Sequence, residues 1–181
     1  MRIISGSKKS ISIRAPKDLP SRPTTDKVKE SLFNILINRF KIDEIRVLDL
    51  FAGSGNISYE FASRGCKKII SIESNINCVN FIKKTKQKLN ILNLDIQLSN
   101  VYTYLKKSKM KYDIIFADPP YDYTKKDYQS IINLVFERNL LMSSGILILE
   151  HSKNINFANN TLFFEQRKYG KVNFTFLKND K

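Results

Sequence analysis

The chain of 181 residues has no tryptophan, one histidine and only two cysteines. Cys66 and Cys78 lack the Cys-x-x-Cys spacing of zinc and redox sites, and His151 has no second histidine to act with. These absences argue against a metal centre and against a disulfide framework. We therefore expect no bound metal and a reducing environment for the protein.

Long apolar runs are also missing. The sequence shows no stretch of 18 apolar residues and no secretory signal pattern, so we expect a cytoplasmic protein that does not enter a membrane. The length suits one domain that buries about 70% of the surface of its unfolded chain. Because no linker, repeat or low-complexity tract divides the sequence, we expect a single domain, residues 1–181. We also expect the protein to be a monomer.

Acidic residues are scarce relative to basic ones. The 17 Asp and Glu stand against 31 Lys and Arg, and the resulting net charge of +14 favours a polyanionic partner such as nucleic acid. The abundance of Ile, Asn and Lys also indicates A/T-rich codons, which are an alternative source of part of the lysine excess. Residues 1–29 hold eight basic and two acidic residues, and the alternation in Ile11-Ser12-Ile13-Arg14 predicts short strands. We interpret residues 1–24 as a basic β-hairpin arm, with a merely solvated hairpin as the alternative.

Strand and helix patterns alternate through residues 25–181. Thr24, Thr25 and Asp26 offer N-cap oxygens to a first helix. Apolar runs predict strands at 46–50, 68–72, 94–98, 113–117 and 145–150, with helices at 56–64, 75–90, 100–107 and 127–139 between them. This alternation predicts a parallel sheet with helices on both faces. Residues 161–168 and 172–178 break the pattern, because Tyr169-Gly170-Lys171 between them predicts a hairpin.

A corner follows the apolar run at 114–117, with the sequence Asp118-Pro119-Pro120-Tyr121. Two consecutive prolines donate no backbone N–H and continue neither a strand nor a helix, so the chain leaves the sheet between a carboxylate and an aromatic ring. Such a corner can present Asp118, the Pro119 carbonyl and Tyr121 to a flat ligand that carries an amino group. Taken alone, the motif is also compatible with a rigid turn that has no chemical role.

Glycines mark a second strand end. Residues 47–55 predict a buried strand that runs into the turn Gly53-Ser54-Gly55, where the backbone takes positive φ or lies against a ligand. No phosphate-loop motif is present, and Ser58 takes the place of the third glycine of G-x-G-x-x-G, which favours a nucleotide-like ligand without a pyrophosphate. Glu73 follows the next predicted strand, about 20 residues after the glycines. In Rossmann-type sheets this is the position of the acid that binds the ribose hydroxyls.

Together these motifs resemble a known family. Asp49-Leu50-Phe51-Ala52-Gly53-Ser54-Gly55 and Asp118-Pro119-Pro120-Tyr121 resemble the cofactor and catalytic loops of S-adenosylmethionine-dependent amino methyltransferases. Across nearly the whole chain, the sequence is similar to the RsmD family of 16S ribosomal RNA (guanine-N2)-methyltransferases. The segments that carry this narrower resemblance are Arg2-Ile3-Ile4-Ser5-Gly6, residues 22–36 with their start Arg22-Pro23-Thr24-Thr25-Asp26, Ser63-Arg64-Gly65 and Tyr169-Gly170-Lys171.

The resemblance implies an α/β fold, the Rossmann-like fold of class I methyltransferases, with a seven-stranded, mostly parallel sheet whose last strand is antiparallel. The implied activity is transfer of a methyl group from S-adenosyl-L-methionine to the exocyclic N2 of one guanine (966 in rRNA numbering). The implied partner is 16S ribosomal RNA, within a small ribosomal subunit or an assembly intermediate.

Roles for individual residues follow from the same resemblance. Asp118 and the Pro119 carbonyl accept hydrogen bonds from the amine, Pro120 completes the corner and Tyr121 stacks on the base. The implied cofactor contacts are Asp49, Phe51, Gly53, Ser54, Gly55, Glu73, Asn100 and Val101. The implied RNA contacts are Arg2, Lys8, Lys9, Arg14, Arg22 and Thr24.

Two positions depart from the family pattern. Asn100 stands where an acid usually meets the adenine amino group, and because the amide lacks the charge we expect weaker cofactor binding. Asn56 follows Gly55, where a small apolar residue is usual.

Alternative functions remain open at this point. A DNA methyltransferase acting on adenine N6 or cytosine N4 usually carries a target-recognition region for which this chain has no room. A protein glutamine-N5 methyltransferase would favour Asn at position 118, and a non-catalytic RNA-binding or assembly protein would have no need of Gly53, Glu73 and Asp118. Neither cysteine stands beside a proline-bearing loop, which disfavours carbon methylation.

Overall fold

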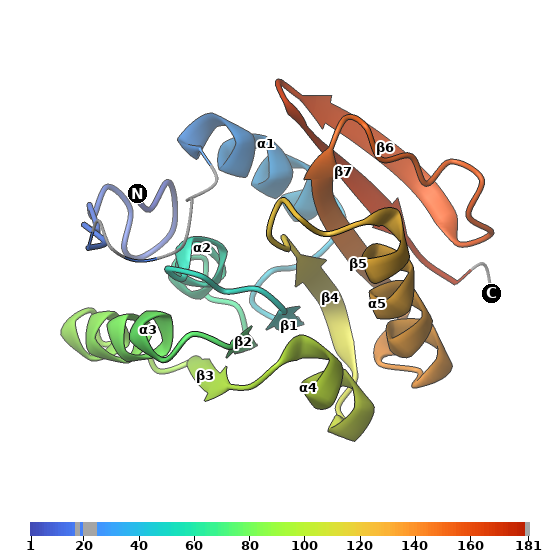
Figure 1. Cartoon of the computed structure of the whole chain (residues 1–181). Helices are drawn as coiled ribbons and strands as arrows, with labels where there is room; N and C mark the ends of the chain where they lie inside the picture. Colours follow the sequence, from blue (N-terminus) through green and yellow to red (C-terminus); the bar gives the residue numbers. More distant parts are fainter. Residues whose placement is uncertain (17–18, 20–24, 180–181) are drawn as a thin grey trace.

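The structure is a computed structural model that describes residues 1–16, 19 and 25–179. Within them, a seven-stranded sheet has the order β3-β2-β1-β4-β5-β7-β6 (Figure 1). The elements follow along the chain as α1 (Asp26–Ile37), β1 (Arg46–Asp49), α2 (Asn56–Ser63), β2 (Lys68–Glu73), α3 (Ile76–Lys88), β3 (Leu94–Leu98), α4 (Val101–Lys107), β4 (Tyr112–Ala117), α5 (Lys125–Glu137), β5 (Leu141–Ser152), β6 (Phe163–Tyr169) and β7 (Val172–Leu177).

Strands β3, β2, β1, β4 and β5 are parallel, as the alternating pattern predicts. The largest difference from the predicted boundaries is the start of β5, which begins at Leu141 instead of residue 145. Leu141 pairs with Tyr112, and the register then shifts before the next pair, so the intervening residues form an irregularity in the strand instead of a turn. Gly145 permits this close approach, because a Cβ there would lie 2.8 Å from the Tyr112 carbonyl oxygen.

Strands β6 and β7 form the predicted hairpin, and β7 lies between β5 and β6. Tyr169 pairs with Val172, which leaves Gly170 and Lys171 as the turn, and Gly170 takes a φ of 60°. Because β7 is antiparallel to β5, with Ser152 opposite Val172, the turn lies at the carboxyl end of β5. The hairpin thus reaches the sheet edge where the predicted site residues end their strands.

Helices cover both faces of the sheet (Figure 1). Leu32 of α1, Phe61 of α2 and Ile82 of α3 belong to one buried cluster, whereas α4 and α5 contribute to the other. Strand β4 contributes alternate residues to the two clusters, in keeping with the period of a strand buried on both faces. This double burial explains why β4 is a continuous apolar run. The residues of β4 in the first cluster are Ile114 and Phe116, and those in the second are Ile115, Ala117 and, before the register shift, Tyr112.

The N-terminal residues 1–13 fold back on themselves but do not form the predicted strands. A single antiparallel bridge joins Arg2 and Ser12. The loop is packed onto α2, since the backbone N–H groups of Ile4 and Ser5 donate to the Glu60 carboxylate at 2.8 and 3.0 Å. Backbone hydrogen bonds also join its two halves, from the Ile3 N–H to the Ile11 carbonyl at 3.0 Å and from the Ile13 N–H to the Met1 carbonyl at 2.9 Å. The boundary placed at residue 24 stays a prediction, because residues 20–24 lie outside the described part of the chain.

Both cysteines are free and buried, and burial raises the pKa of the Cys66 thiol to about 12 and that of Cys78 to about 11. Among the residues that the structure describes, no group of three or more His, Cys, Asp or Glu side chains could hold a metal ion. No helix in the same residues has the length and apolar character needed to cross a membrane.

Candidate active site

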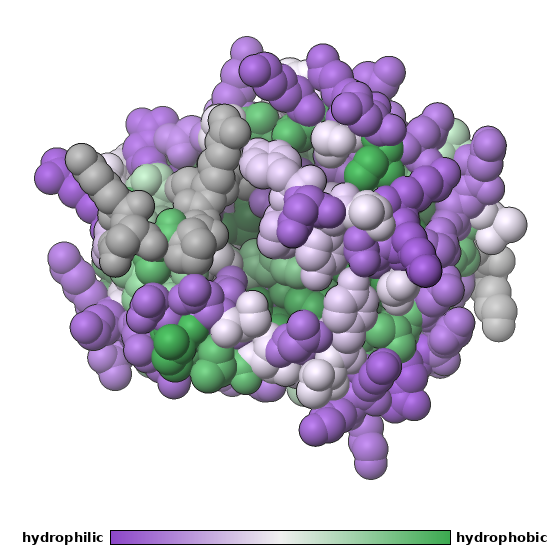
Figure 2. Space-filling model, in the orientation of Figure 1, coloured by the Kyte–Doolittle hydropathy of each residue, from purple (hydrophilic) through white to green (hydrophobic). Residues whose placement is uncertain are grey.

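A cavity of about 1260 Å³ opens at the carboxyl ends of the parallel strands. Figure 2 shows the corresponding hollow near the middle of one face, with an apolar interior inside a mostly hydrophilic surface. Its lining comes from the turns after β1, β2, β3 and β4, the end of β5, the first turns of α1 and the turn between β6 and β7. This is the place where open α/β sheets bind ligands.

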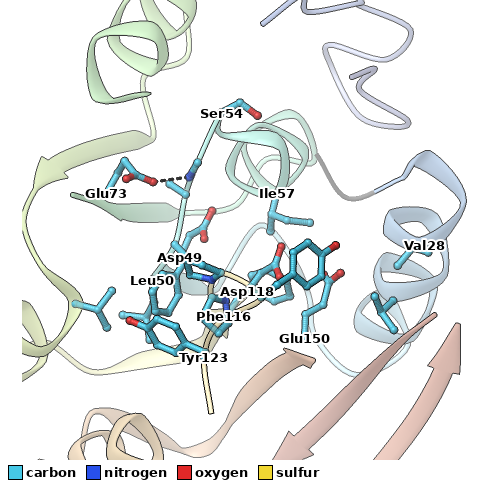
Figure 3. A pocket seen from close by; sticks show the side chains of 18 of the residues that line it. Val28, Asp49, Leu50, Ser54, Ile57, Glu73, Phe116, Asp118, Tyr123 and Glu150 are labelled. Carbon is cyan, nitrogen blue, oxygen red and sulfur yellow. Dashed lines mark hydrogen bonds between the residues drawn. The ribbon is translucent and has the colours of Figure 1, made fainter. Parts of the chain in front are cut away.

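The glycine turn after β1 is held in place by Glu73. The backbone N–H of Gly53 donates to one carboxylate oxygen of Glu73 at 2.8 Å, and the N–H of Asn75 donates to the other at 2.8 Å (Figure 3). Each carboxylate oxygen has a second lone pair, so Glu73 can still accept hydrogen bonds from ligand hydroxyls. Gly53 itself has a φ of 52°, which explains the glycine.

Gly55 has a clear structural role at the start of α2. It is not among the residues that line the cavity, although Asp49, Phe51, Gly53, Ser54, Glu73, Asn100 and Val101 all are. Gly55 caps α2 with a φ of 86°, and a Cβ there would lie 2.7 Å from the ring of Tyr59. The glycine is therefore needed for the turn into α2 and for close packing against Tyr59.

Asp49 is almost fully buried beneath the glycine turn. The Ser58 hydroxyl donates to its carboxylate at 2.6 Å, and Ser58 and Ser71 are hydrogen-bonded at 2.6 Å. Burial, with a smaller contribution from nearby Glu73, raises the pKa of Asp49 to about 6. Ser58, which stands at the position of the third glycine of the motif, thus donates a hydrogen bond to a buried acid.

All four residues of the corner line the cavity. Asp118 is partly buried, Pro119 is buried and the Tyr121 side chain is 77% exposed. Burial raises the pKa of Asp118 well above its usual value, and the charges of Glu150 and Asp49 raise it further. The corner therefore joins a carboxyl group that holds its proton tightly to an aromatic ring that faces solvent.

Glu150 is a site residue that the sequence analysis missed. It is only 7% exposed, lies near the end of β5 and lines the cavity beside Asp118. With it, each of the four adjacent strands β2, β1, β4 and β5 has one acid within two residues of its carboxyl end, and Figure 3 shows Glu73, Asp49, Asp118 and Glu150 in that order across the site. The signal was available, because Glu150 follows an apolar run in the same way as Glu73.

Tyr123 was missed as well. It lines the cavity and packs edge-on against Phe51, with 5.4 Å between ring centroids, and against Tyr128 at 6.2 Å. Its ring therefore supports Phe51 from the side of the proline corner. No motif marks this position, because the contact depends on how the corner folds back over the sheet.

The predicted RNA contacts of the N-terminal arm do not line the cavity. Arg2, Lys8, Lys9 and Arg14 are absent from its lining, and the Arg2 guanidinium pairs with Asp26 at 3.3 Å. Arg22 and Thr24, the other two predicted RNA contacts, lie outside the described residues. The N-cap of α1 is Thr25, whose hydroxyl accepts from the Val28 N–H at 3.4 Å.

Comparison with known proteins identifies the family. The model of the family described as "Conserved hypothetical protein 95" matches residues 1–178. The Ribosomal RNA small subunit methyltransferase D of Buchnera aphidicola (subsp. Baizongia pistaciae) is 32% identical over 99% of this chain and 92% of its own length. The chain belongs to this family, which is the RsmD family.

Solved structures agree with this assignment. A putative methyltransferase from Escherichia coli superposes with a TM-score of 0.86 at 26% identity, covering 100% of this chain and 99% of its own. The Thermus thermophilus 16S rRNA N2 G1207 methyltransferase in complex with AdoMet and guanosine shares the fold, with a TM-score of 0.70 at 20% identity over 88% of this chain and 44% of its own. The fold is therefore the predicted Rossmann-like fold of class I methyltransferases.

The two departures from the RsmD family pattern have local structural roles in this chain. Asn100 is the N-cap of α4, and its side-chain oxygen accepts from the N–H groups of Tyr102 and Thr103 at 2.9 and 3.4 Å. Its predicted contact with an adenine amino group would compete with this cap. Asn56 accepts a hydrogen bond from the buried Lys29 ammonium at 2.8 Å, which ties the start of α2 to α1.

Proposed function

We propose that this chain is an S-adenosylmethionine-dependent methyltransferase that modifies the exocyclic N2 of one guanine in 16S ribosomal RNA. Membership of the RsmD family supports methylation of small-subunit ribosomal RNA. One structural observation supports the chemistry at nitrogen. The corner Asp118-Pro119-Pro120-Tyr121 opens into the same cavity as the glycine turn and Glu73, so an amine at the corner and a cofactor at the glycine turn share one space.

The residues around the glycine turn fit this cofactor. S-adenosylmethionine supplies a methyl group on a positively charged sulfonium, and it also carries an ammonium group and ribose hydroxyls. In this proposal Glu73 accepts hydrogen bonds from the ribose hydroxyls and Asp49 faces the ammonium. In support, both acids line the cavity, and Glu73 accepts the Gly53 N–H of the turn. The four acids along the strand ends suit a ligand with two positive charges and no phosphate.

The corner suits an aromatic amine. The Asp118 carboxylate and the Pro119 carbonyl accept hydrogen bonds from its N–H groups, which favours the tetrahedral nitrogen that can be methylated. Tyr121, with its ring exposed at the mouth, stacks on a base that has left its helix. In this proposal the carboxyl pair of Asp118 and Glu150 takes up the proton that the nitrogen loses after methylation, a role that the raised pKa of Asp118 supports.

Carbon methylation through a cysteine adduct is disfavoured by the positions of both thiols. Neither Cys66 nor Cys78 is among the described residues that line the cavity, and burial raises the pKa of both. A thiolate nucleophile is therefore not available at the corner.

Mapping of the methylated nucleotide tests the proposal. The protein is incubated with labelled S-adenosylmethionine and small ribosomal subunits, or their RNA, from cells that lack the modification. We expect label on the N2 of a single guanine of the 16S RNA. Label on an adenine or cytosine amine, on DNA or on protein would contradict the proposal.

The variant Asp118→Ala tests the role of the corner. It should lower turnover by at least a hundredfold, because an acceptor at the reacting nitrogen is lost, while calorimetry shows the cofactor still bound. Retained turnover would exclude Asp118 from the reaction. Loss of cofactor binding as well would assign it to the cofactor site.

A further inference from the structure

The two ends of the cavity differ in chemistry. One end lies over β3, β2 and β1 and contains the predicted cofactor contacts. The other end lies over β5 and β7, beyond Glu150, between the first turns of α1 and the turn between β6 and β7 (Figures 1 and 3). The described residues at this second end are Thr25, Lys27, Val28, Ser31, Tyr169, Gly170, Lys171 and Val172.

Among the described lining residues, positive charge lies at the second end. Lys27 and Lys171 are the basic residues among the described residues that line the cavity, and both are exposed. Neither ammonium forms an ion pair with any residue that the structure describes, whereas Arg2 of the N-terminal arm is already paired with Asp26. The ammonium groups of Lys27 and Lys171 therefore lie at the mouth of a cavity that is lined with acids at the strand ends.

Both lysines stand on fixed backbone. The turn that carries Lys171 is closed by the pairing of Tyr169 with Val172, and the Tyr169 ring packs on Phe174 with 5.8 Å between centroids. The helix that carries Lys27 is anchored two residues later by Lys29, whose side chain is fully buried. Only the flexible lysine side chains need to adjust to a ligand, which suits contact with a phosphate as a point charge.

We propose that Lys27 and Lys171 form a phosphate-binding subsite that holds the phosphodiester groups on either side of the target nucleotide. This inference rests on the proposed function. S-adenosylmethionine has no phosphate, and its one carboxylate is bonded to the same carbon as the ammonium that we assign to Asp49, at the other end of the cavity. We therefore assign the lysines to the substrate and not to the cofactor. A nucleotide whose base reaches Asp118 and Tyr121 leaves its two flanking phosphates at the mouth, where phosphate contacts fix position without reading sequence.

Salt-dependent RNA binding tests the subsite. A short single-stranded RNA with one guanine is titrated with Lys27→Gln, Lys171→Gln and the double variant by fluorescence anisotropy at several salt concentrations. Each lost phosphate contact should reduce the slope of log K against log salt by about 0.7, and the double variant by about 1.4. Lys27→Arg and Lys171→Arg should restore the wild-type slope, and cofactor affinity should not change.

Lys83→Gln is the matched control, because Lys83 is an exposed lysine of α3 that does not line the cavity. Equal slopes for wild type and both Gln variants, an equal reduction in Lys83→Gln, or no RNA binding by the wild type would overturn the subsite. A different result would contradict the proposed function and not the subsite: the wild type binds RNA with the expected salt dependence but transfers no methyl group to the 16S RNA of the small subunit.

Discussion

At the scale of single residues, the acids of the site influence one another. Asp118 faces Glu150 from β5 and Asp49 from β1, and Tyr128 of α5 lies within the same electrostatic group. Burial and the two neighbouring charges all favour the protonated form of Asp118. S-adenosylmethionine carries a sulfonium and an ammonium against one carboxylate, so its binding would favour the ionised form of Asp118. In the proposed reaction the corner would therefore gain its acceptor charge when the methyl donor is present.

Glu150→Gln should therefore shift the pH dependence of the reaction. Removing the Glu150 charge lowers the pKa of Asp118, so the acid limb of kcat/KM should move to lower pH. The measurement is a pH profile of RNA methylation by the two proteins. Glu137→Gln, at an exposed position near the end of α5, should leave the limb in place. An unmoved limb in Glu150→Gln would mean that this charge does not tune the essential acid.

At the scale of elements, a buried ion pair joins three segments that are distant in sequence. Lys29 of α1 and Glu60 of α2 have side chains that are 1% and 0% exposed, with 3.5 Å between ammonium and carboxylate. Lys29 also donates to the Arg2 carbonyl at 2.6 Å, while Glu60 accepts from Arg64 at 2.9 Å and from the N-terminal loop. These contacts fix residues 1–13 and α1 against the helix that follows the glycine turn.

Lys29→Met should consequently destabilise the protein by about 3 kcal/mol, because the Glu60 charge loses a buried partner. Urea unfolding measures the change, and Lys83→Met provides a solvent-exposed comparison with little effect. The double variant with Lys29→Met and Glu60→Gln should lose less unfolding free energy than the two single variants lose together, since the two groups interact. Additive losses would show that the pair is not energetically coupled.

Local sequence patterns could predict most of these elements but not this junction. The glycine turn and the proline corner are determined by backbone chemistry at Gly53 and Pro119, so their positions at strand ends follow from the sequence. Lys29 carries no such signal, because a lysine on a helix is normally exposed. Its burial depends on Glu60 and on the N-terminal loop, which become neighbours only when the chain has folded.

At the scale of the whole molecule, strand order decides which predicted residues meet. Parallel alternation places Asp49, Glu73 and Asp118 at one sheet edge, and the cavity confirms that they are brought together. The insertion of β7 beside β5 brings Lys171 to the same cavity, although the sequence predicts only a hairpin there. The basic residues of the N-terminal arm were predicted to contact RNA, but Lys8 and Lys9 do not line the cavity. The number of charges in a segment does not specify where that segment packs.

The concentration of acids at this sheet edge should reduce the stability of the whole protein when no cationic ligand is bound. The pKa of Asp49 is raised from its usual 3.8 to about 6 in the folded state, so the folded protein binds this proton more tightly than the unfolded chain. The stabilisation is complete below about pH 4 and is lost as the pH rises through 6, a difference of about 3 kcal/mol.

Asp49→Asn removes this titration while the Ser58 hydroxyl can still donate to the amide oxygen. Without cofactor, the variant should therefore gain stability relative to wild type as the pH rises from 4 to 7, by up to about 3 kcal/mol in urea unfolding. Parallel stability curves would contradict the raised pKa. With saturating S-adenosylmethionine, the wild type should become at least as stable as Asp49→Asn at neutral pH. The ionised Asp49 carboxylate destabilises the protein without cofactor, but the same charge attracts a positively charged ligand, whose binding stabilises the folded state.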